Sequence, residues 1–118
     1  MAIDTGLELD ALLGRIHNNH AAMRQLVEML LAHLPTRRAA VMAAVATADA
    51  DALMRAAHAL KGTLSNFTVG ASWQLAGDLE DLGRADSLDG AIAAQAALET
   101  ELDAVVIELH DWLARQAA

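Results

Sequence analysis

Apolar residues recur every three or four positions along nearly the whole chain, and short polar breaks separate the segments that carry them. This spacing puts the apolar side chains of each segment on one face of an α-helix. Of the 118 residues, 55% are hydrophobic and only 3% are aromatic, with much alanine and leucine, which favours helices over strands. The sequence therefore predicts an all-α protein.

The polar breaks divide the chain into one short and four long helical segments. The short one lies near the N-terminus, and the long ones span about residues 20–47, 50–67 and 70–82 and a last stretch that runs towards the C-terminus. Four amphipathic helices with short loops predict an antiparallel four-helix bundle, with the short helix at its N-terminal end. The length predicts a single domain, residues 1–118. The predicted helix caps are Asn19, Asp49 and either Asp86 or Ser87 at N-termini, and Gly83 at a C-terminus.

Pro35 lies inside the segment 20–47. Proline removes a backbone donor and crowds the preceding turn, but the apolar phase is the same on both sides, which predicts a kink rather than two helices. Arg37 and Arg38 follow it and are predicted to form a solvated face.

Charge and composition exclude several classes of function. The net charge of −8 argues against a nucleic-acid partner, because phosphate backbones are bound by clustered lysine and arginine. The absence of cysteine rules out disulfides and thiolate chemistry. No secretory signal and no run of about 20 apolar residues is present, so we expect a cytoplasmic protein that does not enter a membrane. The starting methionine and short tails favour a free-standing protein.

The stretch AAHALKGTLSNF, residues 56–67, carries the only lysine of the chain and a glycine inside a predicted helix. On a helical wheel, Leu60 and Leu64 fall on the core side, while His58, Gly62, Ser65 and Val69 fall nearly opposite, with Lys61 beside them. Side chains lean towards the helix N-terminus, so residue i+4 covers residue i. Gly62 has no side chain and leaves the imidazole of His58 open to a partner.

An exposed histidine beside a lysine can carry phosphoryl-transfer chemistry. A neutral imidazole is a nucleophile near pH 7, and a lysine one turn away can offset negative charge on a transferred phosphoryl group. The segment 52–77 contains no acidic residue and includes Arg55, which suits a phosphate or an acidic partner. A histidine with a lysine three residues later is also common by chance, so these residues alone leave the function open.

AHALKGTLSNF resembles the phosphoacceptor motif of histidine-containing phosphotransfer (HPt) domains, which has a histidine, then Leu-Lys-Gly, then a small residue or asparagine. The match is strongest over residues 57–62, and DLEDLG at 78–83 and the approach from HLPTRR onward are also similar to the family. The resemblance covers about residues 7–115.

The resemblance implies a phosphocarrier of two-component phosphorelays. His58 would accept a phosphoryl group from an aspartyl phosphate of a receiver domain and pass it to another receiver. Lys61 would assist electrostatically, and Gly62 would give access. The receiver, in a response regulator or hybrid sensor kinase, would supply Mg²⁺, so the chain would need no cofactor or metal. Nothing in the sequence could bind ATP, so no kinase activity is expected, and a monomer is the default.

The chain departs from the family pattern after the motif. Thr68 stands where many members have glycine, with Gly70 two positions on, and Ser72 stands where the next helix often begins with leucine. Trp73 is either an exposed anchor for the receiver or a residue folded into the mouth of the bundle. The expected receiver surface comprises Arg55, Ser65, Val69 and Trp73.

Two other functions compete with phosphotransfer. A helical adaptor could bind a receiver or kinase without phosphate chemistry. A metal- or ligand-binding bundle could use His17 and His20 with His33 or His110, but no pattern completes a metal site. The acidic residues Asp78, Glu80 and Asp81 are predicted to be solvated, with Arg84 able to pair with Glu80 or Asp81.

Overall fold

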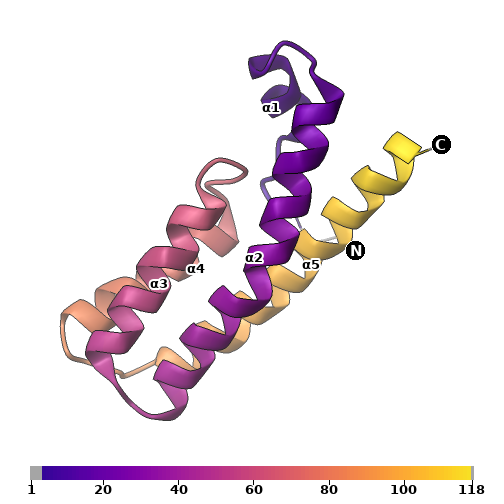
Figure 1. Ribbon diagram of the computed structural model, residues 1–118. Helices are drawn as coiled ribbons and strands as arrows, with labels where there is room; N and C mark the ends of the chain where they lie inside the picture. The colour runs from indigo at the N-terminus through magenta and orange to yellow at the C-terminus, as the bar shows by residue number, and fades with distance from the viewer. Residues whose placement is uncertain (1–3, 118) are drawn as a thin grey trace.

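The computed structural model describes residues 4–117, which form five α-helices and no strand (Figure 1). This confirms the all-α prediction, while residues 1–3 and 118 of the predicted domain lie outside the described residues. The helices are α1 (Leu9–Arg15), α2 (His20–Ala46), α3 (Ala50–Leu64), α4 (Ala71–Arg84) and α5 (Ala91–Ala117).

Helices α2 to α5 close a four-helix bundle in which α3 packs on α2 and α4, and α5 packs on α4 and α2. Helices α2 and α5 have 27 residues each, against 15 in α3 and 14 in α4. The long pair therefore extends beyond the α3–α4 hairpin, and α1 sits at that extended end, beside the start of α2 (Figure 1). The predicted bundle with a short additional helix is confirmed.

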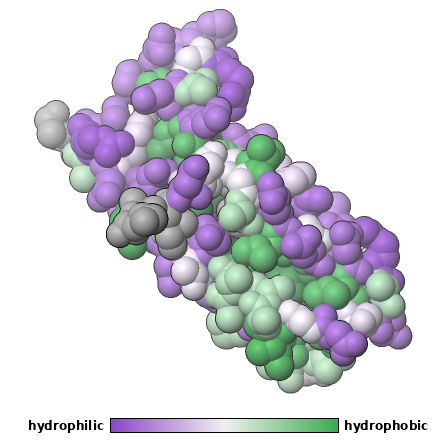
Figure 2. Space-filling model, turned by 180° about the vertical axis from the view of Figure 1, so that it is seen from behind, coloured by the Kyte–Doolittle hydropathy of each residue, from purple (hydrophilic) through white to green (hydrophobic). Residues whose placement is uncertain are grey.

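The core follows the predicted helix faces. In α3, Leu53, Leu60 and Leu64 are fully buried, and Leu79 of α4 and Leu102 of α5 meet them in the same cluster. In the first turn of α5, Ala91 is buried while the neighbouring Ile92 is 76% exposed. Seen from behind, apolar side chains gather on the surface over the half of the bundle that lies farther from α1 (Figure 2).

Two of the predicted helix caps are present. The side chain of Asn19 accepts a hydrogen bond from the Ala22 amide, and that of Asp49 accepts one from the Ala52 amide, each at 3.0 Å. Each side chain satisfies an amide that the first turn of a helix leaves unpaired, which fixes where α2 and α3 begin.

The predicted caps around the α4–α5 turn are wrong. Gly83 lies inside α4 and is buried against α3, where a Cβ atom would approach the Met54 nitrogen to 2.6 Å and the Ala50 oxygen to 2.7 Å. Asp86 takes the left-handed conformation that ends α4, with φ of 53°, and the Ser87 amide donates to the Leu82 oxygen at 3.1 Å. This is the hydrogen-bond pattern of a helix C-terminus, so neither Asp86 nor Ser87 caps the next helix, which begins at Ala91.

Helix α2 is continuous through Pro35, and its axis bends along its length (Figure 1). The prediction that the helix does not split is confirmed. The third predicted helix is too long, because α3 ends at Leu64 and the Phe67 and Thr68 amides fold back onto the Leu64 oxygen in a turn.

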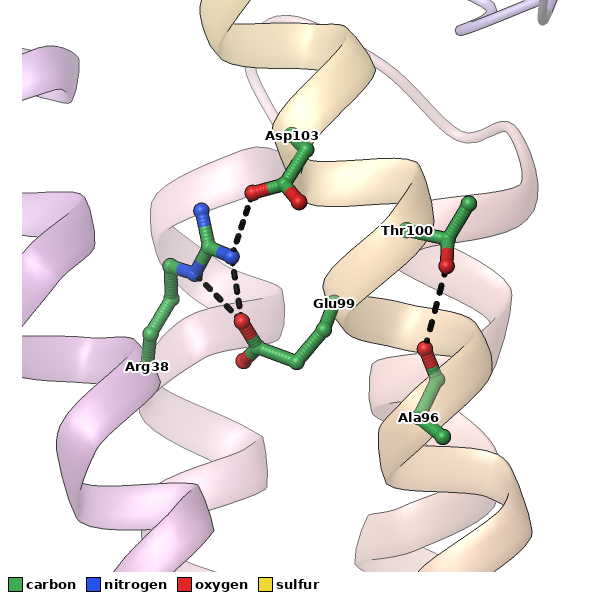
Figure 3. Close-up of polar contacts among 5 residues, drawn as sticks. All are labelled: Arg38, Ala96, Glu99, Thr100 and Asp103. Atoms are coloured by element: carbon green, nitrogen blue, oxygen red, sulfur yellow. Dashed lines mark hydrogen bonds and ion pairs between the residues drawn. The ribbon is translucent and has the colours of Figure 1, made fainter.

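Arg38 does not belong to a solvated face, contrary to the prediction. Its side chain is 19% exposed and reaches across to α5, where Nε donates to Glu99 Oε2 at 3.0 Å and Nη2 donates to Asp103 Oδ1 at 2.7 Å (Figure 3). Burial lowers the pKa of Arg38, but the hydrogen bonds to Glu99 and Asp103 outweigh it and raise the pKa above its usual value. The guanidinium therefore stays charged and joins α2 to α5.

None of the helices within residues 4–117 has the length and apolar character that crossing a membrane requires.

Candidate functional site

His58 projects from the middle of α3 into solvent. Its side chain is 75% exposed, whereas Ala57 and Leu60 on either side of it are fully buried. A Cβ atom built on Gly62 would have no neighbouring atom within 4 Å, so the surface of α3 at Gly62, one turn after His58, is open. The structure thus places both residues on the exposed side of α3, as the helical wheel predicts.

Glu80 of α4 holds the imidazole from the other side. Its Oε2 lies 3.1 Å from Nδ1 of His58 and accepts a hydrogen bond from Nη2 of Arg84 at 2.6 Å. The Glu80 side chain is only 8% exposed. Burial raises the pKa of Glu80, but the hydrogen bonds from Arg84 and His58 outweigh it and hold the pKa below its usual value, so the carboxylate is ionised.

The ionised Glu80 fixes which nitrogen of His58 is free. A carboxylate only accepts hydrogen bonds, so Nδ1 carries the proton in this contact, and in the neutral ring Nε2 keeps its lone pair. The prediction that Glu80 is solvated is wrong, while the pairing of Arg84 with Glu80 and, at 3.2 Å, with Asp81 is confirmed. Sequence reasoning missed Glu80 as a site residue because its contact with His58 depends on how α3 and α4 are aligned.

Lys61 lies across α4 rather than in solvent. Its Nζ is 4.4 Å from the centre of the Trp73 ring, and the lysine is half-buried. Trp73 is itself half-buried and packs against the core cluster. The sequence left Trp73 as an exposed anchor or a residue inside the bundle mouth, and the structure shows an intermediate position that supports the lysine.

The other residues expected at a partner surface are exposed. Arg55 is 71% exposed and pairs with Asp51 at 2.7 Å, and Val69 is 64% exposed just before α4. Ser65 is exposed, and its hydroxyl donates to the Gly62 oxygen at 2.8 Å.

The two departures from the family pattern have separate structural consequences. Thr68 is buried, where its hydroxyl donates to the Thr5 oxygen at 3.0 Å and accepts from the Gly70 amide at 2.8 Å. Thr68 therefore fastens the segment before α1 to the α3–α4 turn. Ser72 is also buried, and its hydroxyl has no hydrogen-bond partner among the described residues.

The four histidines considered for a metal site are all exposed, and His20 Nδ1 lies 2.9 Å from Gln116 Oε1. Within residues 4–117, no three histidine, cysteine, aspartate or glutamate side chains come together in a group that could hold a metal ion.

A model of the Hpt domain family matches residues 25–108, a range that includes His58, Lys61 and Glu80. The chain belongs to the Hpt domain family. The HPt resemblance in the sequence is confirmed, and the chain is a histidine phosphotransfer protein of a phosphorelay.

The bundle is also similar to that of a solved HPt protein. The crystal structure of histidine-containing phosphotransfer protein B from Pseudomonas aeruginosa PAO1 matches with a TM-score of 0.84 and 24% sequence identity, covering 93% of this chain and 96% of that one. At this identity the likeness shows the HPt fold. A comparison with curated proteins gives no match.

Proposed function

We propose that His58 is the phosphoacceptor, and that it takes a phosphoryl group from the aspartyl phosphate of one receiver domain and passes it to another. The observation that carries the proposal is the exposed imidazole whose Nδ1 contacts the buried, ionised carboxylate of Glu80 at 3.1 Å. This arrangement supports Nε2 as the reacting atom, because Nδ1 is occupied by its hydrogen bond to Glu80 and Nε2 is the other ring nitrogen.

The transfer is a substitution at phosphorus. The Nε2 lone pair of His58 forms the N–P bond while the P–O bond to the receiver's aspartate breaks, and the electron pair leaves with the aspartate carboxylate. The Nδ1 proton stays in place, so the phosphorylated ring is cationic, and the adjacent Glu80 carboxylate stabilises that charge. The reverse sequence returns the phosphoryl group to a second receiver.

The remaining site residues have supporting roles in this proposal. Lys61 offsets the negative charge of the phosphoryl group, and Gly62 leaves the approach to Nε2 open. The receiver docks on Arg55, Ser65, Val69 and Trp73, and it brings the Mg²⁺, so the chain uses no cofactor of its own. Docking is transient, because a carrier must release each partner.

We further propose that this carrier has no kinase activity of its own. It acts as a monomer in the cytoplasm. The acidic net charge of −8 supports a monomer through mutual repulsion, and the cysteine-free sequence suits a reducing compartment.

Incubation with a receiver domain carrying ³²P-labelled aspartyl phosphate tests the proposal. Wild type should gain label that is stable to base and labile to acid, as phosphohistidine is, whereas His58→Gln should gain none. Glutamine keeps a hydrogen-bond donor beside Glu80, and the side chain it replaces is 75% exposed, so the urea midpoint should be unchanged.

Label on His58→Gln equal to that on wild type would refute the assignment. A receiver that binds wild type and His58→Ala equally, with no transfer to either, would instead support the helical adaptor.

A further inference from the structure

The outer part of the Lys61 side chain, from Cδ to Nζ, lies against α4. A Cβ atom placed on Gly77 would lie 3.4 Å from Nζ of Lys61, 3.6 Å from its Cε and 3.8 Å from its Cδ. The ammonium then ends 4.4 Å from the centre of the Trp73 ring. The lysine stem therefore passes over the glycine, and its charged end rests on the indole.

Trp73, Gly77 and Glu80 form one stripe along α4, because they are spaced by four and three residues. Glu80 contacts His58 at one end of this stripe, and Trp73 contacts Lys61 at the other. A single face of α4 thus contacts both functional side chains of the acceptor motif, those of His58 and Lys61.

The contact with Trp73 leaves the charge of Lys61 uncancelled. Among the described residues, Lys61 has no carboxylate within ion-pair distance, while the nearby cation Arg84 has two, Glu80 and Asp81. An aromatic face attracts a cation through its quadrupole and carries no net negative charge. The lysine is therefore ordered and still able to attract a phosphoryl group.

We propose that Trp73 is a positioning residue for phosphotransfer, which holds Lys61 on the acceptor face with its charge available. This inference rests on the proposed function of His58 and adds a residue to it. The competing explanation is that Trp73 only covers the core or only touches the receiver, in which case its effect does not depend on Lys61.

A double-mutant cycle separates these explanations. Trp73→Leu should slow transfer from a saturating phosphorylated receiver by about threefold, as expected for a partly exposed cation–π contact, and Trp73→Phe should restore most of the rate. In a Lys61→Ala background, Trp73→Leu should add no further loss at saturation. Gln74→Ala, an exposed neighbour on α4 outside the stripe, is the matched control and should leave the rate unchanged.

The lysine contact can also be measured without any transfer. Aromatic ring currents shift nearby protons, so the Cε protons of Lys61 should resonate upfield in wild type and Trp73→Phe and return to the usual position in Trp73→Leu. Equal rate losses from Trp73→Leu with and without Lys61, or a lysine shift that ignores the substitution, would overturn the inference. A wild type that accepts no label would refute the proposed function instead, and the lysine shift would still decide whether Trp73 holds Lys61.

Discussion

The α3–α4 hairpin and the α2–α5 pair are two antiparallel helix pairs of one bundle, joined in different ways. In the hairpin the backbones approach so closely at Gly83 that a single added methyl group would meet the backbone of α3 at 2.6 Å. The α2–α5 pair also shares the apolar core, and on its surface the long side chain of Arg38 reaches across to Glu99 and Asp103 (Figure 3). Arg38 and Glu99 also line a groove whose apolar residues include Leu31, Pro35 and Val106.

The difference shows where the bundle needs precision. The contact between His58 and Glu80 crosses from α3 to α4, so it depends on the spacing of these two helices to within a few tenths of an ångström. The α2–α5 pair carries no group of the acceptor site, and the contact of Arg38 across it can adjust through a flexible side chain. Each pair also contains a charge that is largely shielded from solvent, Glu80 or Arg38, but only Glu80 contacts the imidazole of His58.

The sharpest test of the close hairpin is Gly83→Ala, for which we expect the largest effect. The methyl group would force α3 and α4 apart, so the free energy of unfolding should fall by about 3 kcal/mol. The matched control is Gly62→Ala on the open side of α3. Its free energy of unfolding should instead rise by up to about 1 kcal/mol, because alanine has a higher helix propensity than glycine. Urea titrations measure both, and equal changes in the two variants would contradict the close approach.

Arg38→Gln tests the α2–α5 connection and should have the second largest effect. It removes a guanidinium that is 19% exposed and leaves Glu99 and Asp103 without it, so unfolding should cost about 2 kcal/mol less. The rate of phosphotransfer, measured well below the melting temperature, should stay at the wild-type value. A slowed transfer in the folded variant would show that this pair does influence the acceptor site.

Glu80→Gln tests the functional side of the comparison. The amide can still accept the Nδ1 hydrogen bond of His58, but it no longer stabilises the cationic phosphorylated ring. Transfer should slow by about fivefold, which corresponds to about 1 kcal/mol. Single-turnover rates with a labelled receiver measure this, and a rate equal to that of wild type would reduce Glu80 to a structural role.

The smallest expected effect is a pH dependence of stability that belongs to Glu80. The pKa of Glu80 is lowered in the folded state from its usual value of 4.5, so its stabilising contribution is complete above that value and is lost as the pH falls through the folded-state pKa. The gap in unfolding free energy between wild type and Glu80→Gln should therefore narrow below pH 4.5, by on the order of 1 kcal/mol or less. A gap that widens on acidification would contradict the assigned direction.

Much of the acceptor helix could be predicted from the sequence because its determinants are local. The apolar period of α3 puts His58 and Gly62 opposite Leu60 and Leu64, and Asp49 marks where the helix begins. The HPt motif adds the chemistry, because it lies within one continuous stretch.

The missing parts depend on contacts between helices. Glu80 and Arg38 are charged, so each helix read alone places them in solvent, yet Glu80 contacts His58 on α3 and Arg38 contacts Glu99 and Asp103 on α5. Gly83 has the composition of a helix end but serves a close approach, which only the packing of α3 on α4 reveals. The spacing of Trp73, Gly77 and Glu80 along α4 was the one available signal that a face of this helix serves the acceptor.

The Thr68 hydroxyl, which joins the Thr5 carbonyl to the Gly70 amide, makes the tip of the hairpin depend on a segment far away in sequence. The backbone amide protons of the α3–α4 turn and of the segment before α1 should therefore exchange with solvent through one shared local unfolding event rather than through two. Protection of the amide of Gly70, the residue just before α4, thus records whether the segment around Thr5 is in place.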